Sequence, residues 1–255
     1  MARRRPGLAD TLTIANGLCG LAVIVVALGH VAPGANRPGT LSHGRLLTCV
    51  ALIVAGSICD VLDGLLAHVR GSSGLGEPLD LMCDLLTFGV APAMLLLASA
   101  ASDADPWRVL AFPVAAALVI VSMLRLARHA SGQAPGDGGF YGLTMPGAAG
   151  AAIALVFLHP APALEFSGVL VICALMVSRV PYPHQGRRMI TLLSIYWCAV
   201  VAALAGALPM RLLALIWLLV VPLTPLVAIA VRRRADAHQL RVHSGATSGV
   251  RLSER

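Results

Sequence analysis

The sequence predicts an all-α fold, a polytopic transmembrane bundle of about eight helices. Of the 255 residues, 58% are hydrophobic and 12% are charged, whereas ordinary soluble domains are about 45–50% apolar. The mean hydropathy of +0.83 points the same way. The apolar residues also gather in long runs, and a helix needs about 20 such residues to cross a bilayer. A lipid bilayer is therefore the expected solvent of most of this chain.

Eight apolar runs locate the expected helices in order. The first run follows three arginines and contains Asn16 and Gly20, so we interpret it as a retained helix and not as a cleaved signal. The fifth and sixth runs are the shortest. The expected spans cover residues 11–31, 46–68, 79–101, 107–126, 143–159, 164–179, 189–207 and 211–231. Together they predict one transmembrane domain over residues 1–232.

The distribution of arginine predicts the topology. With the N-terminus in the cytoplasm and an even number of spans, fifteen of the nineteen basic residues face the cytoplasm. Such an excess of positive charge is typical of cytoplasmic loops. We therefore expect a multi-pass protein of the cell membrane with both termini cytoplasmic. Residues 233–255 are polar and basic, which predicts a disordered cytoplasmic tail.

The net charge of +7 indicates an anionic partner. Nucleic acid is not expected, because the arginines lie between apolar runs and only 4% of the residues are aromatic side chains that could stack on bases. Lipid phosphate fits this pattern better. The six cysteines all lie inside apolar segments and form no CxxC pair, so we interpret them as packing residues.

Four aspartates interrupt the second and third apolar runs, where an ionised side chain is costly. Asp60 and Asp63 are three residues apart near the end of the second run, and Asp80 and Asp84 are four apart near the start of the third. Each pair therefore shares one helix face. The short connection should bring both pairs to one depth near the cytoplasmic surface. Their mutual repulsion requires cations, and clustered oxygen ligands are typical of two Mg²⁺ or Mn²⁺ ions.

Two other interpretations of these aspartates remain open. They could be carboxylates solvated at the membrane interface, or they could line the cation pathway of a transporter. A pathway would spread its carboxylates through the depth of the bilayer, whereas these gather at one end of two helices. Displacement at phosphorus is the reaction that such metal pairs commonly support.

The same segment carries a sequence signature. Asp60-x2-Asp63-Gly64-x2-Ala67-His68, followed by Gly76-x3-Asp80-x3-Asp84, resembles the D-x2-D-G-x2-A-R…G-x3-D-x3-D pattern of the CDP-alcohol phosphatidyltransferase family. Further segments are similar to the bacterial membrane-type phosphatidylserine synthases of that family. They include residues 16–20 (NGLCG), 87–93 (TFGVAPA) and 140–146 (FYGLTMP). The resemblance covers about residues 8–184.

This resemblance implies a six-helix catalytic core extended by two helices. It implies an enzyme that joins the phosphatidyl group of CDP-diacylglycerol to a small polar alcohol, with L-serine as the expected acceptor. Four residues would hold two divalent metal ions, and the last of them would also act as general base: Asp60, Asp63, Asp80 and Asp84. The residues expected to contact the substrates are Gly64, Ala67, His68, Arg70, Gly76, Arg125 and Arg128. Family members are commonly dimers, so a homodimer is a further possibility.

Simpler roles are open for several of these residues. Gly64 and Gly76 could serve helix packing alone, and Arg125 and Arg128 could simply reach the lipid headgroups. His68 stands where the family signature has arginine, and its spacing to Gly76 is shorter than usual. Three alternative functions follow: transfer to another alcohol such as glycerol phosphate, inositol phosphate or choline, binding of the CDP-lipid without turnover, and cation transport.

Overall fold

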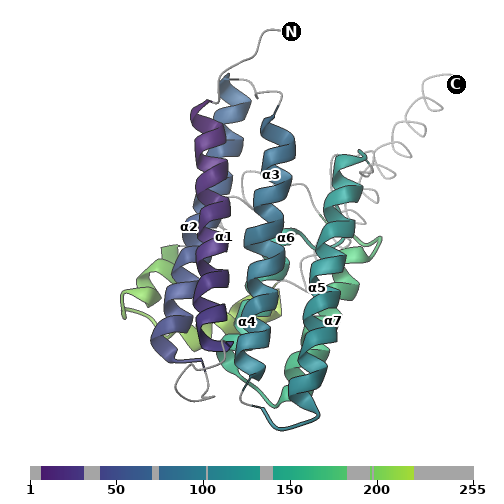
Figure 1. Cartoon of the computed structure of the whole chain (residues 1–255). Coiled ribbons are helices and arrows are strands. Elements are labelled where there is room, and N and C mark those ends of the chain that lie inside the picture. Colours follow the sequence, from purple (N-terminus) through teal and green to yellow (C-terminus); the bar gives the residue numbers. More distant parts are fainter. Residues whose placement is uncertain are drawn as a thin grey trace, which may run out of the picture.

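The computed structural model describes residues 7–31, 41–70, 75–101, 103–132, 140–182, 196 and 198–220. Most of them are helical, and the helices run side by side as an elongated bundle (Figure 1). In chain order the elements are α1 (Leu8–Val31), α2 (His43–Arg70), α3 (Gly76–Asp84), the π-helical turn η1 (Leu85–Val90), α4 (Ala91–Ala100), α5 (Trp107–Ala130), β1 (Phe140–Tyr141), α6 (Met145–Leu158), α7 (Pro162–Val177) and β2 (Pro181–Tyr182).

Within the described residues, four helices are long and apolar enough to cross a membrane: Leu8–Gly29, His43–Leu66, Gly76–Ala100 and Trp107–Ala130. Shorter apolar helices follow at Met145–Leu158, Pro162–Val177 and Met210–Val220. The predicted all-α, multi-pass fold is thereby confirmed. Residues 183–195 and 221–255 lie outside the described residues, and with them parts of the last two predicted spans and the predicted tail. The cytoplasmic placement of both termini stays a prediction.

The third predicted span is one continuous helical rod made of α3, η1 and α4. The π-helical turn starts directly after Asp84, and its Thr87, Phe88 and Gly89 are buried. π-helical turns are uncommon and occur often at functional sites. Pro92 stands near the start of α4 and therefore inside this rod, where its missing N–H removes one main-chain hydrogen bond of the helix. The rod therefore changes its winding next to a predicted ligand.

Small residues let α1 approach its neighbours closely. A Cβ atom added to Gly17 would lie 2.8 Å from the Sγ of Cys83, and one added to Gly20 would lie 2.6 Å from the Oγ1 of Thr87. On α2, a Cβ added to Gly56 would lie 2.9 Å from the Oδ1 of Asn16. Helices in lipid associate mainly through such close packing, because burial away from lipid tails gives no hydrophobic gain. Glycine at these positions therefore fixes α1 against α2 and the third rod.

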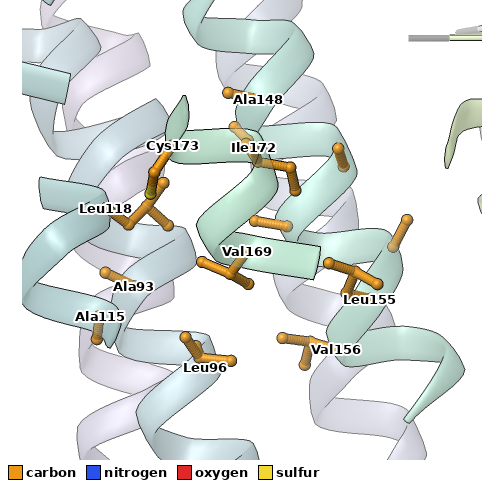
Figure 2. Packing of buried hydrophobic residues seen from close by; sticks show 14 of the residues in the cluster. Ala93, Leu96, Ala115, Leu118, Ala148, Leu155, Val156, Val169, Ile172 and Cys173 are labelled. Carbon is orange, nitrogen blue, oxygen red and sulfur yellow. The ribbon is translucent and has the colours of Figure 1, made fainter. Parts of the chain in front are cut away.

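The second half of the bundle has its own apolar core between α4, α5, α6 and α7. Ala93 and Leu96 of α4 and Leu118 of α5 face Val169 and Cys173 of α7 (Figure 2). The inner side of α6 contributes mostly small buried residues: Ala148, Ala149, Ala151, Ala152 and Ala154. The cysteines are free, and Cys49, Cys83 and Cys173 are buried as expected of packing residues, whereas Cys198 is exposed.

A short antiparallel ladder closes the end of the α5–α6 connection. Phe140 pairs with Tyr182, and Tyr141 pairs with Pro181. Gly142 follows with a φ of +75°, a backbone conformation that favours glycine. This ladder brings the start of α6 next to the end of α7.

Candidate active site

Three aspartates from α2 and α3 come together. One carboxylate oxygen from each of Asp60, Asp80 and Asp84 lies within 4.8 Å of the other two, and all three side chains are partly buried. Asp80 and Asp84 are one helical turn apart on α3, so they present their carboxylates on the same face. The expected convergence of the two helices is confirmed for these three residues.

Asp63, the fourth predicted ligand, has a separate partner. Its side chain is buried, and its Oδ2 accepts a 2.6 Å hydrogen bond from the hydroxyl of Thr13 in α1. A contact this short is typical of a hydroxyl that donates to an ionised carboxylate. The structure therefore groups three of the four predicted ligands and ties the fourth to α1.

Asn16, one turn further along α1, contacts the cluster itself. Its Nδ2 donates a 3.0 Å hydrogen bond to the Oδ1 of Asp84. Its own main-chain carbonyl accepts a 2.8 Å hydrogen bond from the hydroxyl of Thr87 in η1. Thr87 of the π-helical turn therefore contacts the main chain of Asn16, and the side chain of Asn16 contacts Asp84.

The charge of the cluster favours a bound cation. Two carboxylates about 4 Å apart repel each other by roughly 4 kcal/mol at an effective dielectric constant of about 20. Among the described residues, no arginine or histidine forms an ion pair with Asp60, Asp80 or Asp84. The Oδ1 of Asp80 is buried without a hydrogen-bond partner in the described part of the chain. An all-oxygen donor set with an unused buried oxygen fits a hard divalent cation such as Mg²⁺ or Mn²⁺.

The glycines of the signature have different surroundings. Gly64 is exposed, and a Cβ added to it meets no described atom within 4 Å. Helix packing within the described part of the chain therefore does not require glycine there, which leaves room for a ligand beside the carboxylates. Gly76 is the first residue of α3. The side chains of Ala67, His68 and Arg70 lie outside the described residues, and their contacts stay predictions.

Arg125 and Arg128 both donate to main-chain carbonyls. The Nε of Arg125 donates to the carbonyl oxygen of Leu143, and a terminal nitrogen of Arg128 lies 3.3 Å from the carbonyl oxygen of Val177. Both side chains are partly buried. They therefore tie the end of α5 to the start of α6 and the end of α7. A guanidinium has five N–H donors, so each keeps donors that could bind an anion.

Sequence reasoning did not single out Thr13 or the contact that Asn16 makes. The signal for both was present, because Asp10, Thr13 and Asn16 recur every three residues in a mostly apolar helix. That spacing places polar side chains on one helix face. All three are buried in the structure. A buried polar stripe on a membrane helix indicates that it faces other polar groups inside the bundle.

The arrangement suits chemistry on a phosphorylated substrate. Grouped carboxylates can hold cations against a diphosphate, and a carboxylate beside a bound hydroxyl can accept its proton.

Comparison with known proteins agrees with this chemistry. Residues 7–182 match the family described as CDP-alcohol phosphatidyltransferase. A CDP-diacylglycerol–serine O-phosphatidyltransferase of Bacillus subtilis is 32% identical over 174 residues, which cover 68% of this chain and 88% of that protein. The enzyme of the same name from Mycobacterium leprae is 29% identical over 220 residues, 77% of this chain and 67% of its own length. An archaetidylserine synthase of Methanothermobacter thermautotrophicus is 28% identical over 168 residues, 64% of this chain and 68% of that protein.

Proposed function

Because this chain belongs to the CDP-alcohol phosphatidyltransferase family, we propose that it transfers the phosphatidyl group of CDP-diacylglycerol to the hydroxyl of L-serine. The products are phosphatidylserine and CMP. The observation that carries the proposal is the group formed by Asp60, Asp80 and Asp84, whose ligand atoms lie within 4.8 Å of one another. Those residues are three of the four aspartates of the family signature.

The names of the relatives support serine as the acceptor. Both the Bacillus and the Mycobacterium relatives carry serine in their names, and the archaeal relative is named for a serine lipid. These relatives match 64% to 77% of this chain. Serine is therefore the first acceptor to test.

We assign the carboxylates to the cations and the proton. Asp60, Asp80 and Asp84, together with Asp63, would hold two divalent ions, Mg²⁺ or Mn²⁺. Bound ions supply positive charge against the diphosphate and the departing CMP. Asp84 also accepts the proton of the serine hydroxyl. The serine oxygen then forms a bond to the lipid-side phosphorus, and the bond from that phosphorus to the CMP oxygen breaks, with the pair of electrons leaving on CMP.

The remaining predicted residues would bind the substrates. Gly64 and Gly76 leave space for the nucleotide, and the segment containing Ala67, His68 and Arg70 contributes to the same site. Arg125 and Arg128 would bind the carboxylate of serine or a phosphate with the donors that their carbonyl contacts leave free. This binding would pre-position the hydroxyl and so lower the entropic part of the barrier.

The location of the reaction follows from the arginine distribution. Asp60 lies in the second half of α2, and Asp80 and Asp84 lie in α3. With the predicted topology, this end of the bundle would face the cytoplasm. CDP-diacylglycerol would enter from the lipid, and serine would enter from the cytoplasm. The homodimer expected from the family stays a prediction that the mass of the purified protein in detergent would check.

The experiment that tests the acceptor is a substrate panel. Purified protein in detergent receives CDP-diacylglycerol, Mn²⁺ and one of serine, glycerol phosphate, inositol phosphate or choline, and the lipid product is identified by mass spectrometry. We expect phosphatidylserine alone. A different phosphatidyl product would keep the mechanism and replace the acceptor. No lipid product in detergent, together with movement of Mn²⁺ into vesicles that contain the reconstituted protein, would favour a transporter.

A further inference from the structure

The polar face of α1 touches two of the four signature aspartates. Thr13 donates to Asp63, and Asn16 donates to Asp84. The two donors are three residues apart, so they stand on one face of the same helix. Neither belongs to the acidic signature itself. The helix that contributes no carboxylate to the grouped ligands therefore contacts two signature carboxylates.

Asn16 is closely surrounded by α2 and η1. It is 0% exposed. Its main chain is fixed by Thr87, and its Oδ1 faces Gly56, where a Cβ would approach to 2.9 Å. The same Oδ1 is buried and has no hydrogen-bond partner in the described part of the chain. A buried amide oxygen without a partner destabilises the fold, so folding alone does not account for asparagine at this position.

The two donors are neutral, so the aspartates that they contact keep their negative charge for a metal ion. A hydrogen bond from an amide or hydroxyl stabilises a carboxylate without cancelling its charge, whereas an arginine would compete with a cation for that charge. Each donor also occupies only one oxygen of its carboxylate, the Oδ1 of Asp84 and the Oδ2 of Asp63. Within the described residues, the Oδ2 of Asp84 accepts no hydrogen bond, whereas the carboxylate of Asp63 also interacts with the backbone N–H of Gly64.

We propose that Asn16 and Thr13 are positioning residues, which select the carboxylate oxygens that Asp84 and Asp63 present to a divalent cation. In metal sites, partners of this kind orient the ligands and keep them in the geometry that the metal needs. The proposal rests on the proposed function, because it assigns the roles of metal ligands to the same aspartates. It adds α1 to the site as the element that sets their orientation.

Direct metal binding tests the proposal. Mn²⁺ is titrated into the purified full-length protein in detergent, and free Mn²⁺ is measured by electron paramagnetic resonance. We expect Asn16→Leu and Thr13→Val to weaken Mn²⁺ binding by about 10- to 100-fold. Thr13→Ser, which keeps the hydroxyl, should restore binding to within about threefold of the wild type. The melting temperature of Asn16→Leu should stay close to that of the wild type, because the change removes an unpaired buried amide oxygen together with one hydrogen bond to Asp84.

Thr48→Val is the matched control. Its hydroxyl donates to the carbonyl of Gly44 at the other end of α2, and its side chain is exposed, so Mn²⁺ binding should be unchanged. Wild-type Mn²⁺ affinity in both Asn16→Leu and Thr13→Val would overturn the proposal, as would a wild-type protein that binds no Mn²⁺. A wild-type protein that binds Mn²⁺ and transfers nothing to serine would contradict the proposed function alone.

Discussion

Arg125 donates a hydrogen bond from its Nε to the main-chain carbonyl of Leu143, eighteen residues further along the chain. Leu143 in turn donates its N–H to the carbonyl of Leu175 at 3.0 Å. The end of α5, the start of α6 and the end of α7 are thereby joined through one residue. The contact gives a reason for an arginine at the end of α5. Its guanidinium satisfies a carbonyl of the irregular backbone before α6, which lipid could not hydrate.

Replacing Arg125 with lysine tests whether serine binding depends on the positive charge of the side chain or on the shape of the guanidinium. Lysine keeps the positive charge but lacks the planar fork that serves the carbonyl and an anion at once. For Arg125→Lys we expect KM for serine to rise about tenfold or more, with a smaller change in kcat, as measured by serine-dependent CMP release. Arg108→Lys is the control, because Arg108 is exposed and contacts Asp105 at the other end of α5. An unchanged KM in Arg125→Lys would contradict a role in binding serine.

Gly142 should tolerate no side chain. It has a φ of +75°, and an added Cβ would collide with the main-chain carbonyl of Met176. Gly142→Ala should cost about 3 kcal/mol or more of folding free energy, through left-handed strain and the collision together. Gly132→Ala should cost only about 1 kcal/mol, because Gly132 has a φ of +69° but no described atom within 4 Å of the added Cβ. Melting temperatures in detergent compare the two, and equal losses would contradict the close approach.

Gly56 should be required for activity although it carries no functional group. A Cβ there would press on the Oδ1 of Asn16 and the Cγ2 of Thr87, both at 2.9 Å. We expect Gly56→Ala to lower kcat by about tenfold or more, because a small displacement of a positioned group costs much of its contribution. Gly44→Ala, in the same helix with no described atom within 4 Å of the added Cβ, should keep wild-type activity. Full activity of Gly56→Ala would show that Asn16 can move without consequence.

Much of the fold could be predicted because a helix that crosses a membrane needs a long run of apolar residues, which is visible in the sequence. The long apolar runs gave four spans and the short fifth and sixth helices close to their observed bounds. The convergence of Asp60 with Asp80 and Asp84 followed from their helical spacing and the short connection. In both cases a pattern within a short stretch of sequence determines the structure of that same stretch.

Contacts that depend on the relative rotation of helices could not be predicted in the same way. The side of α1 that meets the cluster depends on how Gly17, Gly20 and Gly56 let three helices pack, and spacing within one helix does not contain that information. The separate partner of Asp63 was missed for this reason. The same holds for Glu165, which is buried in α7 and accepts a 3.0 Å hydrogen bond from Ser99 of α4.

The most direct test of the metal-assisted reaction is CMP release by the purified protein in detergent, with CDP-diacylglycerol and serine, as a function of Mn²⁺ or Mg²⁺. Release should require serine, stop when EDTA removes the metal, and fall by about a hundredfold or more in Asp84→Asn, since that change removes a ligand and the base together. Asp84→Asn is nearly isosteric, so its melting temperature shows whether the fold is kept. Serine-dependent release that persists in EDTA, or in a folded Asp84→Asn protein, would contradict the account.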